Sequence, residues 1–319
     1  MTMNQKINYS IIIPHKNSPS LLQRCLDSIP DQEDIQVIVV DDNSNEALVD
    51  FSRFPGVERR NIELYFTKEG KGAGYARNVG LQYAKGKWLL FADADDFFTE
   101  NAFDYLFQQV SSAQDIIYFK VASCYSDSLE PAERNRLTNQ IVDNFLGNKT
   151  ENTEYNLRYK FEPWGKMIKM DLIREENIKF DEIISGNDVM FSVLSGHYAK
   201  SVTAVRDTIY CVTINKGSIS YTQNIENITS RYVVALRYND FLKKKNKKQY
   251  RQSIMPFLYI SITRFGLGVF FRFLCLAFRY RCSLFIKASS WLPSYFRWRK
   301  DRKKDKNYIV IKDDTALSD

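Results

Sequence analysis

The chain has 319 residues, 44% hydrophobic and 26% charged, a globular balance that excludes a disordered or fibrous protein and allows one large domain or one domain with an appendage. The net charge of +7 is concentrated near the C-terminal end: residues 243–251 carry six basic and no acidic side chains, and residues 297–306 carry seven basic and two acidic ones. The five cysteines form no C-x-x-C pair, which argues against a disulfide framework or a structural zinc site and fits a reducing cytosol.

Strand and helix patterns alternate over the first 125 residues. Strands are expected at 9–14, 35–42, 62–67, 87–96 and 115–123, and helical spacing occurs at 18–29, 47–54, 72–85 and 101–112. Such alternation predicts an α/β fold with a mostly parallel sheet that helices cover on both faces. After residue 155 the pattern is looser: 164–180 mixes helical spacing with a turn, 185–199 and 228–246 favour helices, and 202–214 is rich in β-formers.

Polar residues stand at the ends of three of the predicted strands. The strands end at Pro14, Asp42 and Asp96, and the stretch after Pro14 is the polar "HKN". Ligands of parallel α/β sheets bind at the carboxyl ends of the strands. This layout predicts a binding crevice at one edge of the sheet.

Three carboxylates, Asp93, Asp95 and Asp96, stand within four positions in "FADADDFF". Two charges about 5 Å apart repel by roughly 3 kcal/mol at an effective dielectric of about 20. Aromatic neighbours make full solvation awkward, so a hard divalent cation such as Mg²⁺ or Mn²⁺ is one solution. The alternative is a helix N-terminus, because Thr99 and Glu100 precede the helix expected at 101–112 and acids there complement the dipole.

A second acid pair and a glycine-rich stretch accompany this cluster. Asp41 and Asp42 end the neighbouring strand, where a carboxylate can accept hydrogen bonds from a base or a ribose. The stretch "EGKGAGYARN" allows close backbone approach and adds Lys71 and Arg77 for phosphate charge. It contains no G-K-[ST], and no G-x-G-x-x-G follows the first strand, so neither a Walker loop nor a dinucleotide fingerprint is indicated.

Together these blocks resemble family 2 glycosyltransferases. The resemblance rests on "SIIIPHKNSPSLLQRCLDSI", "VIVVDDNSNE", "GAGYARNVGLQYAKGKWLLFADADD" and "WGKMIKMDLIREENIKFDEIISGNDVMFS", and it covers residues 9 to about 222. It implies the GT-A fold, a nucleotide-binding α/β domain with a mixed sheet. It also implies inverting transfer from a nucleotide sugar, most often a UDP-sugar, with Mn²⁺ or Mg²⁺ as cofactor.

The resemblance carries site roles over to matching positions of this chain. The expected nucleotide-sugar-binding residues are Pro14, His15, Asn17, Asp41, Asp42, Arg77, Asn78 and Asp93. Asp93 and Asp95 match the D-x-D motif, with Asp95 the better metal ligand and Asp93 facing the ribose. Asp188 matches the general base, which takes the proton of the acceptor hydroxyl. Trp164 matches an acceptor-side position, where its ring could stack on a sugar, although an ordinary core role is an equal alternative.

Two departures from the family pattern concern the second half of the site. Asn187 stands where the family often has Glu before the base, while Asp188 itself is kept. Before "GSIS" the family often shows aromatic-rich sequence with Arg, and this chain has Thr213 and Asn215 instead. Lys216 is then a weak candidate for holding the diphosphate.

The C-terminal region, expected as residues 226–319 after a catalytic domain of residues 1–225, is apolar, aromatic and basic. Arg264, Arg272, Arg279 and Arg281 interrupt its apolar stretch at 254–298, whose longest uncharged run is too short to span about 30 Å of hydrocarbon. This pattern suits helices at a membrane interface, and a helical subdomain packed on the catalytic domain is the alternative. The N-terminal apolar run is too short for a signal peptide.

The expected partners are a nucleotide-sugar donor, a saccharide or polyprenyl-linked acceptor of surface polysaccharide synthesis, and a peripheral contact with the cytoplasmic face of the plasma membrane. Nucleic acid, a possible partner of the basic patches by charge alone, is not expected. Two other functions compete. A sugar-nucleotide nucleotidyltransferase would need a basic glycine-rich loop after the first strand, and "PHKN" lacks it. A non-catalytic, membrane-associated nucleotide-sugar-binding protein would not need Asp93, Asp95 and Asp188 intact.

Overall fold

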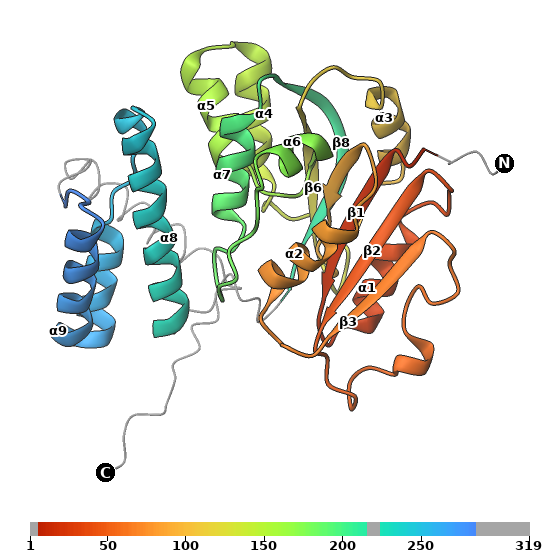
Figure 1. Cartoon of the computed structure of the whole chain (residues 1–319), viewed down its shortest axis with the longest axis horizontal. Helices are drawn as coiled ribbons and strands as arrows, with labels where there is room; N and C mark the ends of the chain where they lie inside the picture. Colours follow the sequence, from red (N-terminus) through yellow and green to blue (C-terminus); the bar gives the residue numbers. More distant parts are fainter. Residues whose placement is uncertain (1–5, 216–223, 285–319) are drawn as a thin grey trace. The chain divides into compact units, whose positions relative to one another are not determined.

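The computed structural model describes residues 6–215 and 224–284, and Figure 1 traces its elements. The strands are β1 (Tyr9–His15), β2 (Ile35–Asp42), β3 (Ile62–Thr67), β4 (Trp88–Phe91), β5 (Phe97–Phe98), β6 (Ile116–Tyr125), β7 (Lys166–Lys169) and β8 (Val202–Ile214). The α-helices are α1 (Pro19–Asp27), α2 (Ala73–Tyr83), α3 (Ala102–Gln109), α4 (Arg136–Gly147), α5 (Glu151–Lys160), α6 (Met170–Glu175), α7 (Val189–Tyr198), α8 (Ile225–Lys244) and α9 (Met255–Arg279), and the 3-10 turns are η1 (Phe51–Arg53) and η3 (Lys248–Tyr250).

The eight strands form one mixed sheet in the order β3-β2-β1-β4-β7-β6-β8-β5. The pairs β3–β2, β2–β1, β1–β4 and β6–β8 are parallel. Strand β7 runs antiparallel to β4 and β6, and β5 runs antiparallel to β8. The predicted α/β fold with a mostly parallel sheet flanked by helices is therefore confirmed.

Side chains of alternate residues in the central strands belong to two hydrophobic clusters, one on each face of the sheet. In β1, Ile11 and Ile13 belong to the cluster that contains Leu22 of α1, and Ile12 belongs to the one that contains Ala76 of α2. Every residue of β1 and β2 is buried. Burial on both faces explains why these strands are mostly apolar in the sequence, and the buried Ser10 and Gln36 hydrogen-bond to each other at 2.6 Å.

The strand expected at 87–96 ends earlier, at Phe91. The acidic residues after it lie in a turn, which the Asp96 N–H closes by donating to the Asp93 carbonyl oxygen at 3.0 Å. The physical reason is that strand β8 approaches this turn and donates hydrogen bonds to the Asp96 carboxylate. The acids therefore stand beyond the sheet and not within it.

Three other expectations are corrected in detail. The helix expected at 47–54 is only the turn η1, which Asp50 caps by accepting a hydrogen bond from the Ser52 N–H. The segment 164–180 begins with the strand β7 before the short helix α6. The helix expected at 185–199 begins at Val189, and helices α4 and α5 had no counterpart in the sequence-based prediction.

The chain divides into two compact units. The first comprises Met1–Ile183 and Asn187–Asn215, and the second comprises Ile184–Gly186 and Lys216–Asp319. The predicted domain boundary between residues 225 and 226 follows a segment, 216–223, that lies outside the described residues, so it stays a prediction.

The second unit is built on the helices α8 and α9. Tyr232 of α8 stacks on Phe273 of α9 with ring centroids 4.3 Å apart, and its hydroxyl donates to the Phe273 carbonyl oxygen at 2.9 Å. Gly266 has φ +83°, so α9 is two helical arms joined at a kink. Among the described residues, one helical stretch, Lys248–Arg279, is long and apolar enough by composition to cross a membrane.

Candidate active site at the carboxyl edge of the sheet

Strands β1, β2 and β4 bring the predicted nucleotide and metal residues to one edge of the sheet. His15, the last residue of β1, pairs in register with Asp41 of β2, and Asp42 follows at the end of β2. Ile12 of β1 pairs with Phe91, the last residue of β4, so the acidic turn after β4 emerges at the same edge. Parallel strand order alone places these groups together.

The acidic turn after β4 gathers three carboxylates. Ligand oxygens of Asp93, Asp95 and Asp96 all lie within 4.8 Å of one another. Asp96 is buried, and its carboxylate accepts hydrogen bonds from the Thr213 N–H at 2.7 Å and from the Tyr210 hydroxyl at 3.0 Å. Asp96 therefore ties the turn to β8. It does not cap α3, whose N-cap position is Asn101.

Asp95 is held at two points and keeps part of its surface exposed. Its Oδ2 accepts from the Asn215 side-chain amide at 2.7 Å, and its carbonyl oxygen accepts from Arg24 at 2.6 Å. Burial raises the pKa of the Asp95 carboxyl above its ordinary value, and the charge of Asp93 raises it further. Asn215, one of the two departures from the family pattern, thus bonds directly to the central carboxylate of the turn.

The acidic turn fits a hard divalent cation. Burial, and then the charges of Asp95 and Asp93, hold the pKa of Asp96 well above its usual range. Three carboxylates this close are costly together unless a proton or a cation offsets their charge. Oxygen donors at this spacing suit Mg²⁺ or Mn²⁺, which need only one or two protein carboxylates.

The loops after β1 and β2 are braced by buried side chains. His15 Nδ1 lies 2.7 Å from Asp41 Oδ2, and His15 Nε2 accepts from the Ser18 N–H at 3.1 Å. Asp41 also accepts from the N–H and the hydroxyl of Ser44. Burial alone would raise the pKa of Asp41, but the hydrogen bonds from His15 and Ser44 bring it below its ordinary value.

Asn17 also connects the loop after β1 with the loop after β2. It adopts a positive φ of 56°, its N–H donates to the Ser44 hydroxyl at 2.8 Å, and its side-chain oxygen accepts from the Asn45 N–H at 2.7 Å. Pro14 is buried within β1, opposite Val40. In this conformation these predicted nucleotide residues shape the loops through their own contacts.

Asp42 organises the glycine-rich stretch that precedes α2. Its buried carboxylate accepts from the N–H groups of Lys71 at 3.1 Å and Gly72 at 2.7 Å. Gly72 has φ +91°, a conformation that side chains disfavour, so a glycine suits this N-cap position of α2. The loop is thereby held at the end of β2.

Helix α2 links the acidic turn to the segment that leads to Asp188. Arg77 is buried, and its guanidinium donates to Asp93 and, at 3.0 Å, to Asn187 Oδ1. Asn78 exchanges two hydrogen bonds with the backbone of Phe180, at 2.8 and 3.0 Å. Asn187, the other departure from the family pattern, thus accepts a hydrogen bond from the arginine that also bonds to Asp93.

Asp188 occupies the N-cap position of α7, and its carbonyl oxygen accepts from the Ser192 N–H at 3.0 Å. Trp164 lies in the core, 6% exposed, with its ring stacked on Tyr210 at 5.9 Å between centroids. Its predicted contact with an acceptor stays a prediction. Lys216, the weak diphosphate candidate, lies outside the described residues.

Sequence patterns did not single out Glu162, Lys166 and Tyr210. Desolvation, and then the charge of Asp188, raise the pKa of Glu162 to about 7. Burial lowers the pKa of Lys166 to about 7, against the opposing effects of Glu162 and Asp188. Both titratable residues flank Trp164 in the stretch "EPWGKM", residues 162–167, and their closeness to that tryptophan was the available signal.

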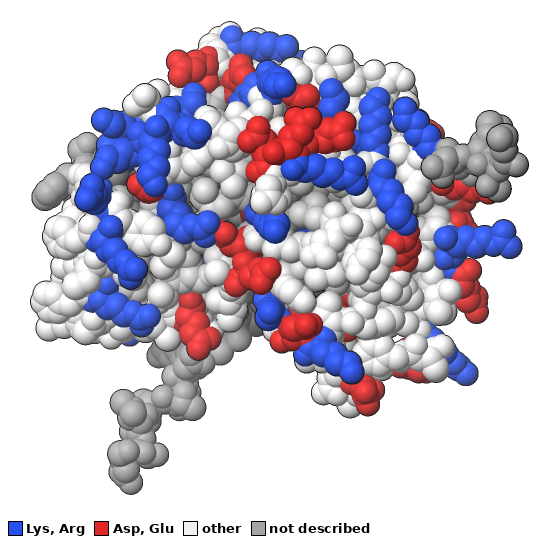
Figure 2. All heavy atoms as spheres, in the orientation of Figure 1, with Lys and Arg blue, Asp and Glu red and all other residues white. Residues whose placement is uncertain are grey.

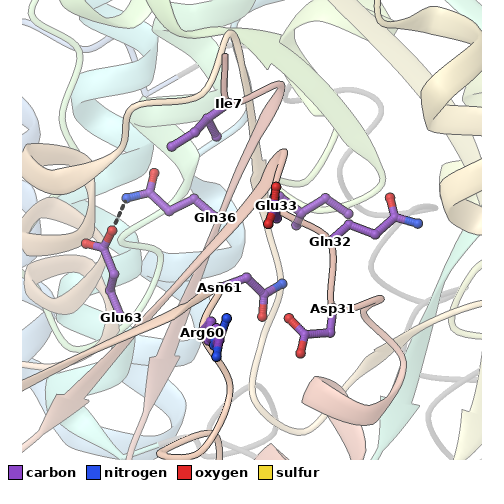
Figure 3. Close-up of a pocket in the computed structure, with 9 residues that line it drawn as sticks. Ile7, Asp31, Gln32, Glu33, Gln36, Arg60, Asn61 and Glu63 are labelled. Carbon is purple, nitrogen blue, oxygen red and sulfur yellow. Dashed lines mark hydrogen bonds between the residues drawn. The ribbon is translucent and has the colours of Figure 1, made fainter. Parts of the chain in front are cut away.

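A pocket of about 480 Å³ lies elsewhere, at the amino ends of β2 and β3. Figure 3 shows Gln36 bonded to Glu63 there, with Asp31, Arg60 and Asn61 around the same hollow. None of the predicted site residues lines it. The chemistry of the carboxyl edge is therefore separate from this pocket.

Comparisons with known proteins show which proteins the chain is similar to. The chain is 25% identical over 253 residues to a poly(ribitol-phosphate) beta-glucosyltransferase of Bacillus spizizenii, covering 75% of this chain and 38% of that relative. Two solved structures share the fold. S. aureus TarS 1-349 in complex with UDP-GlcNAc has a TM-score of 0.56 and 19% identity, covering 81% of this chain and 73% of that one. The mannosyltransferase PcManGT of Pyrobaculum calidifontis, in complex with GDP-Man and Mn²⁺, has a TM-score of 0.51 and 15% identity, covering 89% and 85%.

The expected GT-A architecture is confirmed by these structural matches. The family described as Glycosyl transferase family 2 matches residues 10–168, which include the loops after β1 and β2, α2 and the acidic turn. The chain is therefore a member of glycosyl transferase family 2.

Proposed function

We propose that this protein transfers a sugar, with inversion at the anomeric carbon, from a nucleoside-diphosphate sugar to a hydroxyl of a saccharide or polyprenyl-linked acceptor. The observation that carries the proposal is the Arg77 bridge. One buried guanidinium bonds both to Asp93 of the acidic turn and to Asn187, the neighbour of Asp188. Arg77 thereby connects a carboxylate on the proposed donor side with the segment that carries the proposed base.

In the proposed reaction Asp188 acts as the general base. It accepts the proton of the acceptor hydroxyl while that oxygen forms a bond to the anomeric carbon, and the bond from that carbon to the diphosphate oxygen breaks. One carboxylate is sufficient for this role. Inversion follows because the acceptor attacks the face opposite to the leaving group.

Asp95 and Asp93 are the residues that would hold the divalent cation, with Asp95 better placed because Arg77 already holds Asp93. When bound, Mg²⁺ or Mn²⁺ supplies Lewis-acid neutralisation of the diphosphate charge, so no protein acid is required for the leaving group. Asp96 contributes through β8: it fixes the turn by its bonds to Thr213 and Tyr210. Arg24 also fixes the turn, because its guanidinium donates to the Asp95 carbonyl oxygen.

A UDP-sugar is the proposed donor, and surface polysaccharide the proposed destination. Support comes from the UDP-GlcNAc complex of one structural neighbour and from the name of the Bacillus spizizenii relative, which acts on poly(ribitol-phosphate). The Mn²⁺ in the PcManGT complex supports the proposed metal. The loops that the buried Asp41 and Asp42 brace would shape the space for the base and ribose.

The test is the isosteric variant Asp188→Asn, with the exposed Asp171→Asn of α6 as a matched control. A screen of nucleotide sugars for Mn²⁺-dependent thermal stabilisation and hydrolysis would first identify the donor. We expect Asp188→Asn to lower the rate by about 10²–10⁴-fold while donor binding is kept. Nucleotide release by Asp188→Asn at the wild-type rate would overturn the proposed base. A product that retains the donor's anomeric configuration would overturn inversion.

We also propose that α9 attaches the protein peripherally to the cytoplasmic face of an anionic membrane. Leu267, Phe271 and Phe278, spaced as one stripe of a helix, are 61%, 59% and 68% exposed. Arg272 and Arg279 are exposed beside the stripe, and Figure 2 shows basic side chains gathered over this part of the surface. Apolar stripes edged by arginines suit the interface between headgroups and acyl chains.

The kink at Gly266 favours lying on the membrane over crossing it. The longer arm, 267–279, extends about 20 Å at 1.5 Å per residue, short of the roughly 30 Å of hydrocarbon. Flotation of the full chain with phosphatidylglycerol vesicles would test the attachment. The double variant Leu267→Asp/Phe271→Asp should lose flotation, and Leu137→Asp, an exposed leucine of α4, should keep it. Equal flotation of all three proteins would contradict the proposal.

A further inference from the structure

Arg134 stands in the segment between β6 and α4 and points an exposed charge at the catalytic edge of the sheet. Its neighbour Asn135 fixes this segment against β6, because the Asn135 side-chain amide donates to the Val121 carbonyl oxygen at 2.9 Å. Arg134 itself is exposed, and its guanidinium donates to the Thr213 carbonyl oxygen at 3.1 Å. Arg134 therefore carries a positive charge to the carboxyl end of β8.

The same end of β8 holds the acidic turn. The Thr213 N–H donates to the Asp96 carboxylate at 2.7 Å, and the Thr213 hydroxyl donates to the Asp95 carbonyl oxygen at 2.9 Å. Asn215, two residues further along, donates to Asp95 Oδ2 at 2.7 Å. Thr213 thus stands between the guanidinium of Arg134 and the acidic turn, bonded to both.

The side chains that β8 itself brings to the turn are neutral, so Arg134 adds the charge on this side. Tyr210, Thr213 and Asn215 contribute hydrogen bonds only. Burial, and then the neighbouring carboxylates, raise the pKa of Asp95 and Asp96, and the positive charge of Arg134 opposes that rise at both residues. This effect agrees with the short path through Thr213.

Two other arginines at the turn are already engaged with protein groups. Arg77 is buried and bonds to the carboxylate of Asp93, and Arg24 donates to the Asp95 carbonyl oxygen at 2.6 Å. A guanidinium carries several N–H donors in a planar fork, and a single carbonyl oxygen occupies few of them. The exposed Arg134 therefore keeps N–H groups for a ligand at this edge.

We propose that Arg134 binds the diphosphate of the nucleotide sugar and stabilises the negative charge that collects on it. The inference rests on the proposed function, because it names a further substrate contact at the same site. When the bond to the anomeric carbon breaks, its electron pair stays on the diphosphate oxygen. An arginine fork matches two phosphate oxygens, and a fixed cation near that developing charge lowers the barrier. It also offsets the repulsion between the diphosphate and the carboxylates of the turn.

The test compares Arg134→Gln with the control Arg136→Gln, which removes the exposed arginine at the first position of α4. The affinities of wild type and both variants for UDP, inorganic pyrophosphate and uridine are measured by calorimetry in the presence of Mg²⁺. Arg134→Gln should bind UDP and pyrophosphate about tenfold more weakly, the effect of one lost hydrogen bond to a charged group. Its affinity for uridine, which has no phosphate, should be unchanged. Arg136→Gln should match wild type with all three ligands.

An Arg134 that only held β8 through Thr213 would affect uridine as much as the two phosphate ligands, and that result would overturn the inference. A pyrophosphate affinity that is equal in Arg134→Gln and wild type, or absent from both, would overturn it too. Pyrophosphate has no base, so it tests Arg134 whichever nucleoside the donor carries. Wild type that binds pyrophosphate but not UDP would refute the proposed donor, and the pyrophosphate affinities would still decide the role of Arg134.

Discussion

Asp95→Asn should be more stable than wild type in the absence of metal and less stable than wild type at saturating Mn²⁺. The ligand oxygens of the three acids lie within 4.8 Å of one another, and two full charges about 5 Å apart repel by roughly 3 kcal/mol at an effective dielectric of about 20. Partial exposure of Asp95 and its raised pKa reduce that figure, so we expect metal-free Asp95→Asn to be about 1 kcal/mol more stable than wild type. The asparagine oxygen can still accept the Asn215 hydrogen bond.

Binding of Mn²⁺ acts in the other direction. A ligand at 100 times its Kd stabilises the folded state by about 2.7 kcal/mol, which is a rise in melting temperature of roughly 5–10 °C for a unit of about 200 residues. Wild type should show this rise and Asp95→Asn should not, because its best-placed ligand is gone. The two melting curves should therefore change order when Mn²⁺ is added.

The assay is a thermal melt of each protein over a Mn²⁺ titration, with exposed Asp31→Asn as the control acid-to-amide change. The control should melt like wild type with and without the metal. An equal Mn²⁺ response of Asp95→Asn and wild type would refute the assignment of the metal to this turn. A metal-free Asp95→Asn clearly less stable than wild type would refute the argument from repulsion.

Two further predictions concern residues that hold the loops of the site. Asn78→Ala should lower the free energy of unfolding by about 1–3 kcal/mol, because the N–H and carbonyl groups of Phe180 lose their partner; a urea midpoint equal to wild type would contradict this. Asp41 has a lowered pKa, so its stabilising effect is complete above the unfolded value of about 4 and is lost as the pH falls through the folded value. Ser44→Ala removes one of its hydrogen bonds, so the stability deficit of this variant in urea should be largest above about pH 4 and should shrink below it; a deficit independent of pH would contradict the linkage.

The parts of the fold that sequence patterns predicted are those set by neighbouring residues. Apolar runs of the right length mark β1 and β2 because both of their faces are buried, and the polar groups at their ends follow where the sheet stops. Since β1, β2 and β4 are parallel, their carboxyl ends meet at one edge. The meeting of Asp41, Asp42 and the acidic turn could therefore be inferred before any coordinates.

The remaining features depend on contacts between distant parts of the chain. The early end of β4 and the burial of Asp96 arise from Tyr210 and Thr213 of β8, more than 110 residues further along, and no local periodicity encodes that approach. Lys166 stands in a segment whose sequence mixes helical spacing with a turn, and only the fold shows that it begins a strand and bonds to Ser192 of α7. Asn215 looked like a loss relative to the family pattern, and only the fold reveals its bond to Asp95.

The Arg77 bridge has a kinetic consequence. A metal–diphosphate that engaged Asp93 would compete with Arg77 for that carboxylate, and the same guanidinium holds Asn187 beside Asp188. Occupancy of the proposed nucleotide side would then change the bonding of the segment that carries the proposed base. The two substrates should then bind in a compulsory order, with the nucleotide sugar first and the acceptor second.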